Sequence, residues 1–313
     1  ELLRHSSPAA CHAANQLMST SNNNSMTTCA SCGKSGDDIK TCTACKQVKY
    51  CSVACQKAHR QIHKRECKKR AAELFDEALF REPPPREECH ICCLPLPFNG
   101  AQVIYQSCCG KTLCHGCLYG CVRICCPFCR TPALTSHEEG VMRLKKRIEL
   151  NDAGAFYTLG CKYRDGMIGL LQDYKKAFEL SVRAAELGSI DAHFHVASAY
   201  YHGQGVETDI KKAKHYYELG AMRGDESARH NLGTVEHSEG NTNRAMRHWM
   251  ISARVGMDDS LKMIRQGFLN GYVKKDEYEK TLRAHKESID ELKSDQRDNA
   301  SLQYRLSGGV GRM

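Results

Sequence analysis

The sequence predicts a mostly α-helical protein in which two small metal-stabilised modules precede an α-solenoid of helical repeats. Three observations support this fold class. Of the 20 cysteines in 313 residues, nineteen lie before Gly140. Most of them form CxxC pairs, whose two thiolates can converge on one tetrahedral metal ion. Beyond Asn151 the sequence repeats itself at intervals of 37 and 36 residues, which is typical of stacked helical units.

The first cysteine module spans residues 29–67. Its pattern is CxxC, CxxC, YCxxxCQ and HKxxC, and a helix would place His63 and Cys67 on one face because they are four residues apart. The pattern resembles a MYND-type zinc finger and covers it completely. The resemblance implies two structural zinc ions. Their ligands would be Cys29, Cys32, Cys51 and Cys55 for one ion, and Cys42, Cys45, His63 and Cys67 for the other.

The resemblance also implies a class of partner for this module. MYND fingers bind short proline-containing peptides, and most carry a tryptophan five residues after the YCxxxC cysteine. This chain has Arg60 at that position. The aromatic platform on which an extended peptide would dock is therefore missing.

The second cysteine module spans residues 89–130. It contains too few large apolar residues to close a core, so metal must supply its folding energy. An early CxIC pair and a final CPxC pair followed by Arg130 resemble a RING-type zinc finger of all-cysteine ligation. RING ligands alternate between two ions. The resemblance thus implies one zinc held by Cys89, Cys92, Cys114 and Cys117, and another held by Cys108, Cys109, Cys126 and Cys129.

One pair in this module departs from the RING pattern. Cys108 and Cys109 are adjacent, whereas at least one residue usually separates the corresponding ligands, so the sequence leaves their separate roles open. Cys93, Cys121 and Cys125 remain without a ligand role, and we expect them to be small buried side chains. Since each module has eight expected ligands, we expect about four zinc ions per chain.

The remaining N-terminal segments are connectors. Residues 68–88 predict a helix that ends before three consecutive prolines, Pro83 to Pro85, because proline cannot continue a helix. Residues 131–150 predict a linker and a basic helix. Residues 1–28 lack an apolar period and are expected to form a disordered tail.

Residues 151–272 carry the repeats. Aligned segments begin at Ala155, Ala192 and Ala228, and each is followed by a second segment that ends in small residues and a glycine. The elements LGxxY, a glycine-rich turn, DxxKA and AAxxG resemble the Sel-1-like repeat, a relative of the tetratricopeptide repeat. Small residues such as Gly160 would let neighbouring helices approach closely.

The chain ends in a charged segment. Residues 273–306 predict a capping helix that covers the last repeat, as solenoids require, with a short coiled-coil dimer as the alternative. Residues 307–313 are expected to be a loose tail.

Composition argues against several function classes. The N-terminal segment has no apolar run of signal-peptide length, so the clustered CxxC pairs favour zinc in a reducing compartment over disulfides. No run reaches the roughly eighteen apolar residues that a membrane span needs. We therefore expect an intracellular protein, cytoplasmic or nuclear, with no membrane partner. The motifs GxxxxGK[ST], GxGxxG, GxSxG and HExxH are absent, and no catalytic side chain is assigned.

Two functions compete. The RING resemblance implies a ubiquitin ligase, which binds a ubiquitin-conjugating enzyme and holds its ubiquitin in a reactive pose. Ile91, Pro127 and Arg130 match the contact residues for that enzyme and for ubiquitin, and the repeats would recruit substrate. The alternative is a non-enzymatic adaptor that binds protein partners through the MYND-like finger and the repeats.

A third hypothesis, a nucleic-acid-bound regulator, rests on the formal charge of +9 and the basic run Lys57–Arg70. That run lacks interleaved aromatic residues and overlaps the expected metal ligands. We interpret it as a solvated helix face and expect no nucleic-acid partner.

Overall fold

The structure, a computed structural model, describes residues 28–97, 102–121 and 124–306. It divides into two compact units, Glu1–Phe75 and Asp76–Met313. The expectations for the tails 1–28 and 307–313 lie outside the described residues, apart from Thr28, which forms a β-bridge with Ser35.

The first unit is a small module built around cysteine. Its strands β1 (Lys40–Thr41) and β2 (Lys49–Tyr50) pair antiparallel, and the helix α1 (Val53–Leu79) follows. The buried residues of its core are Cys29, Cys42, Cys45 and Tyr50. Because sulfur supplies most of this core, apolar burial alone cannot hold the module together.

The second unit begins with the cysteine-rich stretch. The strands β3 (Val103–Tyr105) and β4 (Thr112–Cys114) form an antiparallel hairpin, and the short helix α2 (His115–Gly120) follows directly. The buried core here combines leucine and cysteine side chains: Cys89, Leu96, Leu113, Cys114 and Cys117.

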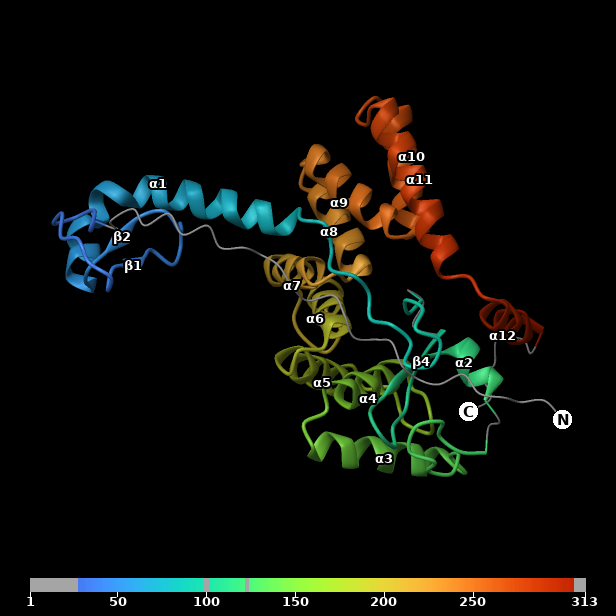
Figure 1. Cartoon of the computed structure of the whole chain (residues 1–313). Helices are drawn as coiled ribbons and strands as arrows, with labels where there is room; N and C mark the ends of the chain where they lie inside the picture. Colours follow the sequence, from blue (N-terminus) through green and yellow to red (C-terminus); the bar gives the residue numbers. More distant parts are fainter. Residues whose placement is uncertain (1–27, 98–101, 122–123, 307–313) are drawn as a thin grey trace. The chain divides into compact units, whose positions relative to one another are not determined.

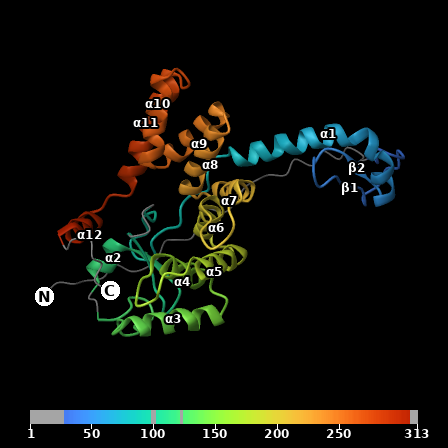
Figure 2. The ribbon, with the colours of Figure 1, turned by 180° about the vertical axis from the view of Figure 1, so that it is seen from behind.

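Helices make up the rest of the second unit. They are α3 (His137–Glu149), α4 (Ala153–Asp165), α5 (Tyr174–Glu186), α6 (Ile190–His202), α7 (Ile210–Met222), α8 (Glu226–Ser238), α9 (Thr242–Arg254), α10 (Asp258–Leu269), α11 (Lys275–Glu291) and α12 (Asp295–Leu306). From α3 to α11, each helix packs against the next one in the chain (Figure 1). The view from behind shows the same stacked pairs (Figure 2). The expectation of a mostly helical protein with a repeat solenoid is confirmed.

Aspartate residues fix where several of these helices begin. Each lies at the N-cap, where its carboxylate accepts hydrogen bonds from backbone N–H groups that have no partner within the helix. These residues are Asp152, Asp173, Asp209 and Asp225. Gly166 and Gly203 end α4 and α6 at φ angles of 63° and 71°, a left-handed conformation that glycine adopts without strain.

Small residues let paired helices pack closely, as the sequence predicted. A Cβ atom at Gly160 would lie 3.3 Å from the carbonyl oxygen of Ala177 on α5. At Gly233 of α8 it would lie 2.6 Å from the indole nitrogen of Trp249 on α9. Any larger residue at Gly233 would push the two helices of this pair apart.

The last residues of α1 belong to the second unit. Leu79 is fully buried among residues such as Tyr217 and Leu232. The guanidinium group of Arg229 donates a 2.8 Å hydrogen bond to the carbonyl oxygen of Leu79. Helix α1 thus ends four residues before Pro83. The buried Arg229 side chain satisfies the carbonyl group of its last residue, Leu79.

The expected capping helix over residues 273–306 is two helices in the structure. The first, α11, packs against α9 and α10. Ser294 then starts a new helix, because its hydroxyl accepts a 3.3 Å hydrogen bond from the backbone N–H of Arg297. This second helix, α12, packs against α2 of the cysteine-rich stretch.

Candidate metal centres

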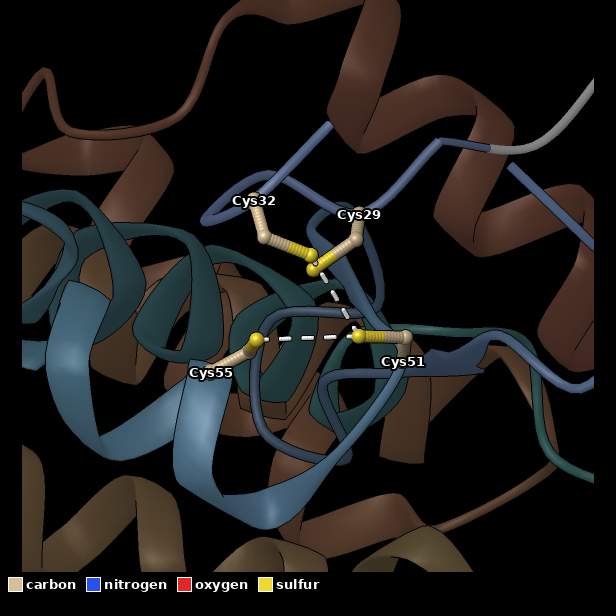
Figure 3. Close-up of side chains that lie close together, drawn as sticks. All are labelled: Cys29, Cys32, Cys51 and Cys55. Carbon is tan, nitrogen blue, oxygen red and sulfur yellow. Dashed lines mark hydrogen bonds between the residues drawn. The ribbon is translucent and has the colours of Figure 1, made fainter. Parts of the chain in front are cut away.

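Four cysteine side chains converge beside the start of α1. Cys29 and Cys32 lie in the loop before β1, Cys51 follows β2, and Cys55 lies in the first turn of α1. Their sulfur atoms lie within 4.8 Å of one another. Cys51 Sγ is 3.5 Å from Cys32 Sγ and 3.6 Å from Cys55 Sγ (Figure 3). The structure brings together the four residues that the sequence assigned to one zinc ion.

A second group of four lies in the same unit. It joins Cys42 and Cys45, from the turn between β1 and β2, to His63 and Cys67 on α1. Cys42 Sγ lies 3.8 Å from Cys67 Sγ, and Cys45 Sγ lies 3.4 Å from Nε2 of His63. His63 and Cys67 lie one helical turn apart on α1, so both side chains point toward the turn between β1 and β2, as predicted.

The second unit holds two further groups of four sulfur atoms, each within 4.8 Å. They are Cys89, Cys92, Cys114 and Cys117, and Cys108, Cys109, Cys126 and Cys129. Cys92 Sγ and Cys114 Sγ are 3.9 Å apart in the first group, and Cys109 Sγ and Cys126 Sγ are 3.8 Å apart in the second. Ligand pairs alternate between the two groups along the chain.

The adjacent pair Cys108–Cys109 reaches its group because the hairpin turns sharply. The backbone N–H groups of Cys109 and Gly110 both donate to the carbonyl oxygen of Gln106. Gly110 has a φ angle of 76°, which suits glycine. Cys109 Sγ then lies near Cys126, and Cys108 Sγ lies 3.3 Å from Cys129 Sγ. Both adjacent cysteines therefore face the same centre.

Each of the four groups contains one thiol whose pKa is lowered to about 6 by hydrogen bonds: Cys29, Cys42, Cys89 and Cys129. For Cys29 the main donor is the backbone N–H of Cys51. For Cys129 it is the hydroxyl of Thr131, whose Oγ1 lies 3.1 Å from the sulfur atom. No pattern in the sequence indicated this role of Thr131. A thiolate is the form of cysteine that binds metal.

At Cys89 burial opposes ionisation, but the backbone N–H groups of Cys114, Cys92 and Ile91 outweigh it and lower the pKa to about 6. The N–H of Cys114 lies 3.3 Å from Cys89 Sγ. The backbone thus favours a thiolate at this buried position.

The donor atoms fit zinc. Tetrahedral coordination with Zn–S bonds of about 2.3 Å places neighbouring sulfur atoms about 3.8 Å apart. The shortest sulfur–sulfur distances, 3.3 to 3.9 Å, lie around that value, and all donor atoms of each group lie within 4.8 Å of one another. Sets of Cys₄ and Cys₃His are typical of structural zinc, where four protein ligands leave no open position for catalysis. The four groups can therefore hold zinc ions that stabilise the fold.

The predicted contact residues of the RING-like stretch lie at its surface. Ile91 is 40% exposed, Arg130 is exposed and Pro127 is partly exposed. Arg130 follows the last cysteine of its group with a φ angle of 59°, so that its side chain is directed by a tight turn and not by a regular element.

The expectation for the surplus cysteines was wrong. Cys93 and Cys125 are exposed, and Cys121 is partly exposed. Cys93 has a φ angle of 55°. It directly follows Cys92 in the turn that points Cys89 and Cys92 inward, and its own side chain therefore faces outward.

Comparison with family models gives two matches. The MYND finger model matches residues 29–67, and the Sel1 repeat model matches residues 157–189 and 190–225. The chain carries a MYND finger and Sel1 repeats. These two resemblances, inferred from the sequence, are confirmed, and the two modules together support a role in protein–protein interaction.

The similar solved structures include two bacterial proteins. One is a Sel1 repeat protein from Oxalobacter formigenes, at 25% identity and a TM-score of 0.45, covering 56% of this chain and 70% of that one. The other is c5321, a protective antigen of uropathogenic Escherichia coli strains displaying an SLR fold. It has 18% identity and a TM-score of 0.44, covering 63% of this chain and 45% of that one. The comparison with curated proteins found no match.

None of the helices in the described part of the chain has both the length and the apolar character that crossing a membrane requires.

Zinc content is the direct measure of these centres. Native mass spectrometry of the folded chain is expected to find four zinc ions, because four complete donor sets converge. A variant with Cys29 and Cys32 replaced by serine should keep the two ions of the second unit. Two or fewer ions in the well-folded natural chain would remove the RING-like interpretation.

Proposed function

We propose that this protein is a RING-type ubiquitin ligase that takes up its substrate through the Sel1 repeats. The observation that carries the proposal is the alternation of ligand pairs in residues 89–130. Cys89 and Cys92 group with Cys114 and Cys117, whereas the intervening Cys108 and Cys109 group with Cys126 and Cys129. This cross-braced order, with a hairpin and a short helix between the pairs, is typical of RING domains.

A RING domain performs no covalent chemistry of its own. It accelerates ubiquitin transfer by holding the conjugating enzyme and its thioester-linked ubiquitin in a reactive pose. The metal ions stabilise the two loops that carry the docking residues. Ile91 lies between two ligands of the first loop, and Pro127 and Arg130 lie in the last loop. Their exposure supports a docking role.

The repeats offer a surface for a protein substrate. A cavity of about 200 Å³ lies among α4, α5 and α6, and its lining includes Arg164, Tyr174, Phe178, Phe194 and His195. Aromatic rings beside an arginine are the side chains that contribute most to protein–protein binding energy. This mixed lining favours a peptide segment with both apolar and polar side chains.

The second candidate is a non-enzymatic adaptor, and one contact favours it. In RING domains the helix at the sixth ligand takes part in docking, and here α12 packs against α2, the helix that contains the sixth ligand, Cys117. The face of α2 that carries Gly116 is covered, although Tyr119 on α2 is 40% exposed. An adaptor would use the MYND finger and the repeats for binding and would need no free face on α2.

A discharge assay separates the two candidates. The purified chain is mixed with each member of a broad panel of conjugating enzymes loaded with ubiquitin, and loss of the thioester is followed. A ligase should accelerate discharge of at least one enzyme by tenfold or more. If none is discharged faster than in buffer, the ligase proposal fails and the adaptor stands.

A further inference from the structure

The C-terminal helix α12 fits closely onto the RING-like stretch, although about 180 residues separate it from α2 in the sequence (Figures 1 and 2). A Cβ atom at Gly116 of α2 would lie 2.9 Å from the backbone of Arg297. Real side chains do not tolerate so short a contact with backbone, so only glycine allows this approach. Ala300, one turn further along α12, is 2% exposed.

Arg297 reaches from α12 into the first zinc-ligand loop. Its Nη1 donates to the carbonyl oxygen of Pro95 at 2.9 Å and to that of Leu292 at 3.0 Å. Its Nη2 lies 3.4 Å from the carbonyl oxygen of Leu94 and 3.6 Å from Cys92 Sγ. One guanidinium group therefore joins the end of α11, the loop after the first knuckle, and a predicted zinc ligand.

The charge of this side chain needs a partner. Arg297 is 7% exposed, and no carboxylate in the described part of the chain forms an ion pair with it. A buried guanidinium without a counter-charge would destabilise the folded state. The groups beside it that can carry negative charge are the cysteines of the first RING-like group, of which Cys92 is in direct contact.

A zinc ion held by the four thiolates Cys89, Cys92, Cys114 and Cys117 would supply the missing charge. Two positive charges on the metal and four negative charges on sulfur leave a net charge of about −2 on the centre. Hydrogen bonds from a neighbouring group to a ligand fix its orientation and stabilise its charged form. The geometry of Arg297 matches this role, since the same nitrogen contacts both the sulfur atom and the loop backbone.

We propose that Arg297 is a positioning residue of the zinc centre formed by Cys89, Cys92, Cys114 and Cys117, and that α12 is thereby an integral part of the RING-like module. Arg297 balances the negative charge of the centre and orients Cys92. The inference rests on the proposed zinc ligands of this module. It goes beyond them, because it assigns a function to a residue near the far end of the chain.

Zinc release from the full chain tests the assignment. In Arg297→Met the side chain keeps much of its length and loses the charge and all the donors. One of the four zinc ions should then pass to a colorimetric chelator at least about tenfold faster, the lower end of the usual effect of losing an outer hydrogen bond to a ligand. Arg297→Lys keeps the charge and should give an intermediate rate. The matched control is Arg283→Met, which changes an exposed arginine on α11 and should release zinc as the natural chain does.

A spectroscopic measurement separates charge from simple packing. In the cobalt-substituted protein, loss of an N–H···S hydrogen bond raises the energy of the sulfur lone pairs and shifts the sulfur-to-metal charge-transfer band to longer wavelength. We expect this shift for Arg297→Met and not for Arg283→Met. A natural chain that holds four zinc ions, with equal release rates and spectra for both variants, would overturn the role of Arg297 and leave the zinc centres intact. A natural chain that holds only two ions would overturn the centres themselves.

Discussion

Replacing Ile91 by aspartate is expected to abolish ubiquitin discharge and leave the zinc content unchanged. Ile91 is an exposed apolar side chain between two metal ligands, and the RING resemblance places it against the conjugating enzyme. A carboxylate at that contact would lose its water without gaining a partner. Each 1.4 kcal/mol lost from docking weakens the complex about tenfold, so a cost of ~3 kcal/mol already weakens it more than a hundredfold.

The matched control is Ile62→Asp. Ile62 is 77% exposed on α1 and lies in the MYND finger, so the same change of charge there should leave discharge at its original rate. Native mass spectrometry should find equal zinc content in both variants. If Ile91→Asp discharged ubiquitin as fast as Ile62→Asp, Ile91 would not be a docking residue.

Replacing Arg130 is expected to give a different result from replacing Ile91 in the same discharge assay. Its guanidinium group is expected to donate hydrogen bonds between ubiquitin and the conjugating enzyme, which affects the rate of transfer more than the binding of the enzyme. Arg130→Ala should therefore slow discharge by roughly tenfold or more and leave enzyme binding intact. Loss of enzyme binding in Ile91→Asp but not in Arg130→Ala would distinguish a docking role for Ile91 from a positioning role for Arg130.

Replacing Trp249 by alanine is expected to be among the most destabilising single changes in the repeats. Trp249 is fully buried between α8 and the helices that follow α9, and its indole N–H donates a 3.1 Å hydrogen bond to the carbonyl oxygen of His230. Removing so large a side chain leaves a cavity beside Gly233, which has no side chain to fill it. Such truncations cost roughly 3–5 kcal/mol.

Urea denaturation followed by circular dichroism measures this loss. Trp249→Phe is the control, because phenylalanine keeps most of the apolar volume although it lacks the rest of the indole ring with its N–H, so the loss of stability should be smaller. If Trp249→Ala lowered the free energy of unfolding by less than about 1 kcal/mol, α8 and α9 would not pack as described. Zinc content should be unaffected, since Trp249 belongs to a separate core cluster from the RING-like cysteines.

The sequence alone predicted much of the fold and the composition of the metal centres. A zinc site is assembled from knuckles, in which spacing of two residues already brings a pair of thiolates together. The residue types and spacings thus indicated metal, and the resemblance to MYND-type and RING-type fingers implied the four ligand sets that the structure brings together. The helical repeats were equally visible, because each unit has the same periodicity and the same small residues, including Gly160.

Tertiary structure decided the remaining points. The sharp turn at Gly110 allows both Cys108 and Cys109 to face one centre, and the exposure of Cys93 follows from the backbone of its knuckle. The break at Ser294 and the packing of α12 on α2 join segments far apart in the chain. Such contacts leave no periodicity in the sequence, because they depend on which surfaces fit together. The burial of Arg297 beside Cys92 is of this kind. The sequence shows that Arg297 is charged, but only folding brings it into contact with the sulfur atom of Cys92.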